Sequence, residues 1–64
     1  MLAFLEERGF TLVRVRGSHH VMNNGQLRTV VPIHGSEILK IGTLHGILRD
    51  IRMSAEEFAN EWQA

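Results

Sequence analysis

The chain of 64 residues contains no cysteine and only one proline. Without thiols, neither a disulfide nor a thiolate metal site can stabilise the fold. A domain near this size buries only about 60% of the surface that its unfolded chain exposes. We therefore expect one domain over residues 1–64, with a small core and modest stability.

Long apolar runs are also missing. The apolar stretch from Met1 to Leu5 ends at once in Glu6, Glu7 and Arg8. This stretch is too short for the core of a signal peptide or for a membrane span. The sequence thus predicts no membrane association, and the cytoplasm is the default location.

Acidic residues are absent from a long central part of the chain, although the formal net charge is zero. Residues 8–36 hold four arginines, three histidines and no Asp or Glu, whereas residues 37–64 hold three basic and five acidic residues. Such asymmetry within a small fold favours one cationic face, for which phosphate is a common ligand. The alternative is that these charges are ordinary solvated residues, but the complete lack of acids favours nucleic acid.

Three segments have the character of β-strands, namely residues 11–16, 19–23 and 27–33. The first alternates valine with arginine, and the third is rich in β-branched residues. Asn23-Asn24-Gly25 is a strong hairpin signal between the second and third segments. We therefore expect a three-stranded antiparallel meander.

Helices are predicted on both sides of these strands. A short first helix ends at Gly9, a typical left-handed residue after a helix. A second helix has Thr43 as its N-cap and one apolar face formed by Leu44, Ile47, Leu48 and Ile51.

A short last helix starts with a capping box formed by Ser54 and Glu57, and its apolar stripe favours Phe58 and Trp62 as core residues. The alternative for Trp62 is an exposed ring that docks a partner, because aromatic residues are enriched at interfaces. The complete order is α-β-β-β-α plus a short C-terminal helix. This is an α+β fold with the helices on one face of the sheet, and double-stranded-RNA-binding domains share that order.

The histidines are the candidates for chemistry, because the unperturbed pKa of imidazole, about 6.5, suits proton transfer near neutral pH. His19 and His20 follow the turn Gly17-Ser18. Neighbouring residues of a regular strand point to opposite faces, so one of the two borders the core, and the sequence does not decide which. On the residues alone, a strand histidine bonded to a backbone carbonyl is favoured over a catalytic one.

Further residues could support a phosphate site. Ser18 belongs to this set as a turn residue rather than as a nucleophile, because no base accompanies it. The candidates for phosphate contacts are Arg14, Arg16, Arg28 and Lys40.

His20 and His34 are the accessory candidates. His20 is interpreted as structural or peripheral. His34 could be a second acid or base, a phosphate contact or a loop-ordering group, and the last is favoured. No histidine pair has metal-ligand spacing, so the sequence predicts neither a metal nor another cofactor.

Three blocks of the chain together resemble the HicA toxins, small mRNA interferases of toxin–antitoxin pairs. The blocks are Gly9-Phe10 followed by Arg14–His20, then Val31–Gly35, and finally Gly42–Asp50 running on to Phe58. The resemblance implies a double-stranded-RNA-binding-like fold and the toxin of a type II pair. It also implies metal-independent endoribonuclease activity on mRNA, with His19 as general acid or base. The implied partner is a HicB-like antitoxin, which occludes the toxin until the antitoxin is degraded.

Two other functions stay open at this point. One is a non-catalytic RNA-binding module of the same fold, which a His19→Ala variant would distinguish. The other is a degenerate toxin that acts as a protein-interaction partner, motivated by a first helix shorter than is usual in the family. Arg52 stands where the family often has glycine. A homo-oligomer is a further option for so small a domain.

Overall fold

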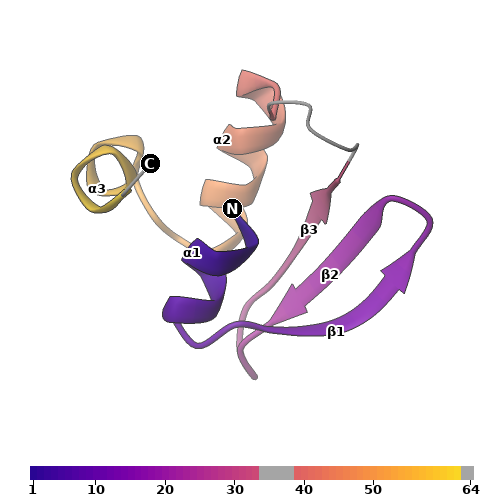
Figure 1. Ribbon diagram of the computed structural model, residues 1–64. Helices are drawn as coiled ribbons and strands as arrows, with labels where there is room; N and C mark the ends of the chain where they lie inside the picture. The colour runs from indigo at the N-terminus through magenta and orange to yellow at the C-terminus, as the bar shows by residue number, and fades with distance from the viewer. Residues whose placement is uncertain (34–38, 63–64) are drawn as a thin grey trace.

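The computed structural model describes residues 1–33 and 39–62. It contains α1 (Leu2–Glu7), β1 (Thr11–Arg16), β2 (His19–Asn23), β3 (Arg28–Pro32), α2 (Ile41–Asp50) and α3 (Ala55–Glu61). The three strands form an antiparallel sheet in the order β1-β2-β3, with the helices on one side of it (Figure 1). The predicted α+β fold and its order of elements are therefore confirmed. Within the described residues, no helix is both long enough and apolar enough to cross a membrane.

The sheet has two faces of different character, because directly paired residues of antiparallel strands point to the same side. We call the side that carries the helices the helix-side face and the other side the open face. Met22 of the central strand pairs with Leu12 and Thr29, and all three point to the helix-side face. Of these, Met22 and Thr29 are buried. The helix-side face of β2 and β3 therefore forms one wall of the core.

The core lies between this wall and the first two helices. Its buried residues are Phe4, Leu5, Phe10, Met22, Val31, Ile47, Leu48 and Ile51. The predicted apolar face of α2 is thus confirmed, with Leu44 and Phe58 packed partly buried against the core. Trp62 was expected in the core, but this prediction is wrong because its side chain is 37% exposed. Its ring lies at the margin instead, with centroid distances of 5.5 Å to Phe4 and 5.2 Å to Phe58.

One polar pair crosses from the sheet to α2. Thr29 is only 1% exposed, and its hydroxyl donates a hydrogen bond to Oδ2 of Asp50 at 2.9 Å. A buried hydroxyl without a partner would carry a desolvation penalty of about 1–3 kcal/mol. Asp50 therefore satisfies the threonine and fixes the C-terminal end of α2 against β3.

The ends of α1 and α2 share one backbone motif. After α1, the amide of Phe10 donates to the carbonyl of Leu5 at 3.1 Å, and Gly9 has a φ of +88°. After α2, the amide of Met53 donates to the carbonyl of Leu48 at 2.9 Å, and Arg52 has a φ of +59°. Both are Schellman motifs, in which the residue after the helix adopts the left-handed conformation. Glycine occupies that position after α1, and arginine occupies it after α2.

The two C-terminal helices begin differently. At α3 the predicted capping box is confirmed: the Glu57 amide donates to Ser54 Oγ, and the Ser54 amide donates to Glu57 Oε1, both at 3.0 Å. The prediction of Thr43 as the cap of α2 is wrong, because α2 begins at Ile41 with Lys40 as its N-cap and without a side-chain cap bond. The apolar periodicity marks only the buried face, so it missed the exposed first turn.

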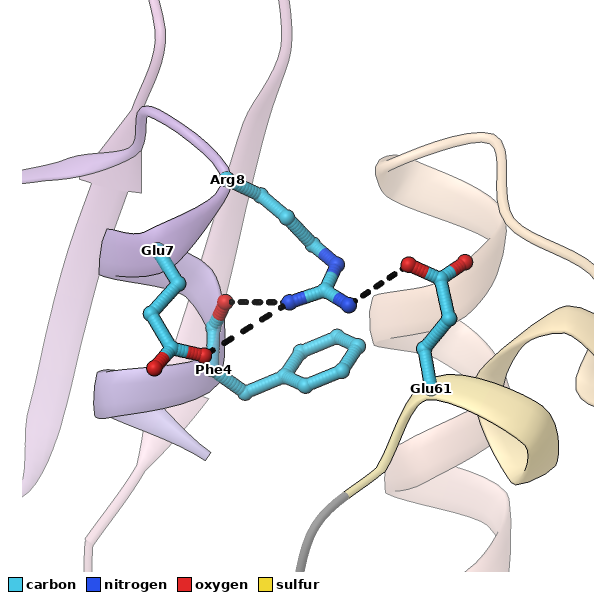
Figure 2. A network of polar contacts seen from close by, with 4 residues as sticks. All are labelled: Phe4, Glu7, Arg8 and Glu61. Atoms are coloured by element: carbon cyan, nitrogen blue, oxygen red, sulfur yellow. Dashed lines mark hydrogen bonds and ion pairs between the residues drawn. The ribbon is translucent and has the colours of Figure 1, made fainter.

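Arg8 makes the polar contacts between the end of α1 and α3. The Nη1 atom of Arg8 donates to the carbonyl oxygen of Phe4 at 3.1 Å, and Nη2 donates to Oε1 of Glu61 at 2.7 Å (Figure 2). The guanidinium carbon also lies 3.6 Å from the centroid of the Phe4 ring. Arg8 was counted in the basic central segment, but the fold uses it to hold two helices together.

Candidate nucleic-acid interface

The candidate site lies on the open face, at the end of the sheet where the β1–β2 turn is located. His19 pairs across the strands with Arg16 on one side and with Pro32 on the other. Side chains in such direct pairs have Cβ atoms about 4.5–5.5 Å apart and point the same way. Both His19 and Arg16 are exposed. An imidazole and a guanidinium therefore project side by side into solvent.

The next row of the open face adds a second arginine. Arg14 pairs with Val21, which in turn pairs with Val30. Val21 is only 7% exposed, yet it is not part of the core cluster on the other side of the sheet. The cross-strand neighbours of Val21 on this face are Arg14 and Val30, and Arg14 has the longer side chain of the two. The aliphatic stem of an arginine can pack on such a residue while its charged end stays in water.

An irregularity in β1 decides that the arginines share the face of His19. The register shifts between Leu12 and Arg14, so that Val13 is an extra residue with no partner on β2. This is a β-bulge, in which two residues of one strand oppose one residue of its neighbour. If Leu12 kept its partner and the pairing continued without the bulge, Arg14 and Arg16 would point to the helix-side face. The bulge therefore places them beside His19.

His20 points away from the candidate site. It pairs with Val15 and Val31, shares the helix-side face with Met22, and is half-buried. Its Nδ1 atom lies 3.3 Å from the carbonyl oxygen of Ser18. His20 is therefore the histidine that borders the core, and the structure does not bring it together with His19.

Ser18 has a backbone role in the turn that precedes β2. Its carbonyl oxygen accepts a hydrogen bond from the amide of Ile33 at 2.7 Å and also lies beside the ring of His20. These contacts fix the start of β2, and hence His19, against the end of β3. Ser18 thus positions the turn, in agreement with its interpretation as a turn residue.

The remaining candidates lie further away. Arg28 is exposed on the open face, in the row that contains Asn23 and Thr11. Asn23 is four residues from His19 along β2, a separation of about 13 Å at the rise of a β-strand. Lys40 is exposed at the N-terminus of α2 rather than on the sheet. His34 lies outside the described residues.

The open face is cationic within the described part of the chain. Its residues are Thr11, Arg14, Arg16, His19, Val21, Asn23, Arg28, Val30 and Pro32, and none of them is acidic. The ion pairs among residues 1–33 and 39–62 all involve Arg8, so no described acid neutralises the three arginines of this face. In the same residues, no group of three or more histidine or carboxylate side chains could hold a metal ion. This surface can attract and orient a phosphodiester.

Sequence reasoning missed two features of this site. Val21 was assigned no role, although it is a buried apolar residue of the open face and pairs directly with Arg14. The available signal was its position two residues after His19 in the same strand. The bulge was also missed, although the consecutive apolar residues Leu12 and Val13 interrupt the alternation that a regular strand requires.

Residues 1–53 match a protein-family model described as HicA toxin of bacterial toxin–antitoxin. The match includes the whole sheet, α1 and α2, and it ends at the Schellman motif before α3. No curated protein and no solved structure is similar enough to match.

Proposed function

The chain belongs to the HicA toxin family of bacterial toxin–antitoxin systems, and from this membership we propose that it is an endoribonuclease that cleaves mRNA with His19 as its catalytic group. The observation that supports this proposal most strongly is the cross-strand pair of His19 and Arg16 on the open face. The pair combines a group that transfers protons with a group that binds phosphate. His20, its neighbour in the chain, is on the opposite face and has no such partner.

The proposed reaction uses the 2′-hydroxyl group of the RNA as its nucleophile. His19 removes the proton of this hydroxyl, the 2′-oxygen forms a bond to the adjacent phosphorus, and the bond from phosphorus to the 5′-oxygen breaks. The leaving 5′-oxygen takes a proton from water, and the hydroxide that remains takes the proton from His19, which returns to its neutral form. The products are a 2′,3′-cyclic phosphate and a 5′-hydroxyl end. No metal takes part in this scheme.

The arginines have two tasks in this proposal. Arg16, in the same row as His19, stabilises the negative charge that develops on the phosphoryl oxygens in the transition state. Arg14 and Arg28 bind neighbouring phosphates, which fixes the register of the RNA without reading its sequence. Lys40, exposed at the N-terminus of α2, provides a further phosphate contact. The site would act in the cytoplasm, where mRNA is translated.

Membership of a toxin–antitoxin family implies an antitoxin partner. We propose that this partner is a HicB-like protein that covers the open face. Such a cover would block RNA from His19 and its arginines at the same time.

The adjacent histidines offer a matched experiment. We expect His19→Ala to lower RNA cleavage about 10²–10⁴-fold, the usual contribution of general acid–base catalysis, and to leave RNA binding nearly unchanged. His20→Ala removes the same side chain from the helix-side face and should keep cleavage within a few-fold of the wild type. The measurement is cleavage of a labelled RNA by purified proteins, with circular dichroism to verify that each variant is folded.

Other results would assign a different function. If the wild type binds RNA and never cleaves it, the protein is a non-catalytic RNA-binding module. If His19→Ala cleaves as fast as the wild type, His19 is not the catalytic group. A substrate with 2′-O-methyl groups tests the chemistry separately, because it lacks the proposed nucleophile and should stay intact.

A further inference from the structure

β1 is an edge strand with a free outer side. The sheet order places β1 at one edge and β3 at the other. The edge formed by β3 ends in Pro32 and lies next to α2. All six residues of β1 are exposed, and no element among residues 1–33 and 39–62 pairs with its outer side. Unpaired amides and carbonyls along such an edge can accept a further strand.

β1 also carries apolar side chains that the helices do not cover. Leu12 and Val15 point to the helix-side face, but they are 47% and 53% exposed, and Val13 in the bulge is 57% exposed. None of the three belongs to the buried core or to the partly buried residues packed against it. The helices therefore cover β2 and β3 and leave the apolar side of β1 open to a partner.

The two faces of β1 would contact different kinds of side chain on a partner strand. On the helix-side face, an added strand would have to cover Leu12 and Val15 with apolar residues. On the open face, it would meet Arg14 and Arg16, and opposite charges in cross-strand positions stabilise a sheet. A strand with alternating apolar and acidic residues satisfies both sides, because its side chains alternate with period two.

A second copy of β1 does not meet this requirement. Antiparallel pairing of two copies that keeps equivalent faces together brings the arginines of both copies onto one face. Like charges in facing positions destabilise a sheet. The arginines thus act against self-association and in favour of an acidic partner.

We propose that the outer edge of β1 binds an extended segment of a partner protein in which acidic and apolar residues alternate, and that this segment adds a fourth strand to the sheet. Backbone hydrogen bonds provide the affinity in such strand addition, and the alternating side chains provide the specificity. If Arg14 and Arg16 bind RNA as in the proposed function, the acidic residues of the added strand would pair with the same two arginines. The added strand would therefore compete with RNA.

Short synthetic peptides test the edge directly. The probe alternates glutamate with valine, and one control peptide has lysine in place of every glutamate. We expect the glutamate peptide to shift the amide NMR signals of residues 11–16 and to slow their hydrogen exchange. It should bind about tenfold or more tightly than the lysine peptide, because two cross-strand charge pairs change sign.

A charge exchange provides the matched variant. The double variant Arg14→Glu/Arg16→Glu should no longer bind the glutamate peptide and should bind the lysine peptide instead. Arg28→Glu changes an arginine of the same face that is not on β1, and it should leave peptide binding unaltered. The proposal would be overturned if the wild type bound both peptides equally or bound neither. It would also be overturned if the NMR shifts were confined to Val21 and Val30, because the peptide would then bind the open face without adding a strand to β1.

Competition with RNA separates this proposal from the proposed function. If the glutamate peptide binds β1 and displaces RNA, both stand. If it binds β1 and RNA stays bound, the edge site stands and the assignment of Arg14 and Arg16 to RNA is wrong.

Discussion

Among residues 1–33 and 39–62, Arg52 is the residue other than glycine that has a positive φ. Its φ of +59° lies in the left-handed region, where a β-carbon costs about 1–2 kcal/mol. Gly9 adopts a similar φ of +88° at the equivalent position after α1, without that cost. The same motif therefore occurs twice in the chain, once with the residue that suits it and once without.

We predict that Arg52→Gly raises the free energy of unfolding by about 1 kcal/mol, because it removes the left-handed strain. Gly9→Ala should lower it by a similar amount for the inverse reason. Urea denaturation followed by circular dichroism measures both. If Arg52→Gly instead destabilises the protein, the arginine side chain makes contacts that outweigh the strain of its backbone.

At the scale of elements, the capping box of α3 is sensitive to pH. Hydrogen bonds from the backbone and the side chain of Ser54 lower the pKa of Glu57 below its ordinary value. A carboxyl group whose pKa is lowered by folding stabilises the folded state above its unfolded pKa. This contribution is lost as the pH falls through the lower, folded pKa, because the unfolded chain binds the proton more readily.

We predict that the helical signal of α3 and the stability of the protein decrease as the pH falls below the ordinary pKa of glutamate. Glu57→Gln keeps an oxygen that can accept the Ser54 amide but cannot be titrated in this range. The variant should therefore show a weaker dependence of stability on pH over that window. Denaturation curves of the wild type and Glu57→Gln at several acidic pH values give the free energy of unfolding of each. If this free energy depended on pH identically in both proteins, Glu57 would have no part in the acid response.

The strands were predictable because local rules determined them. Residues 11–16 and 19–23 were predicted with the bounds that the structure has, and the third strand was predicted slightly too long. The capping box and Gly9 were also found, since each depends on neighbours within a few residues. The first turn of α2 was missed because nothing buried marks it.

The candidate site was only partly predictable. The pairing of His19 with Arg16 depends on the strand register, and the assignment of Arg14 to the same face depends on a bulge between strands. The roles of Arg8 and Trp62 depend on contacts between the two ends of the chain. Arg8 and Glu61, for example, are 53 residues apart in the sequence. Sequence periodicity contains no information on such distant contacts.

At the scale of the whole molecule, α3 is an addition to the part that matches the family. It has no buried residue, and its attachment includes the Arg8–Glu61 contact, the rings of Phe58 and Trp62 against Phe4, and contacts with α2. Phe4 is nevertheless only 5% exposed. The last helix thus completes the cover of an aromatic residue that belongs to α1.

We predict that Arg8→Met lowers the free energy of unfolding by about 1 kcal/mol. The variant removes the ion pair with Glu61, the longer contact with Glu7, the hydrogen bond to the Phe4 carbonyl and a cation–π contact, but it keeps an apolar side chain on Phe4. Part of the loss should disappear at high salt, which already weakens the ion pair in the wild type. Glu61→Gln removes the ion pair with Glu61 alone and serves as the control. Equal losses in the two variants would show that the other contacts of Arg8, with the Phe4 ring, the Phe4 carbonyl and Glu7, contribute nothing.

The bulge at Val13 has a consequence for how chains of different length can share this fold. A strand without Val13 would pair Leu12, Arg14 and Arg16 with the same partners as before, since the extra residue has none. Relatives one residue shorter between the glycines that flank β1 can therefore present the same charged surface. In an alignment of such chains, the gap belongs at Val13, and the spacing from arginine to histidine stays constant while the spacing to the first helix varies.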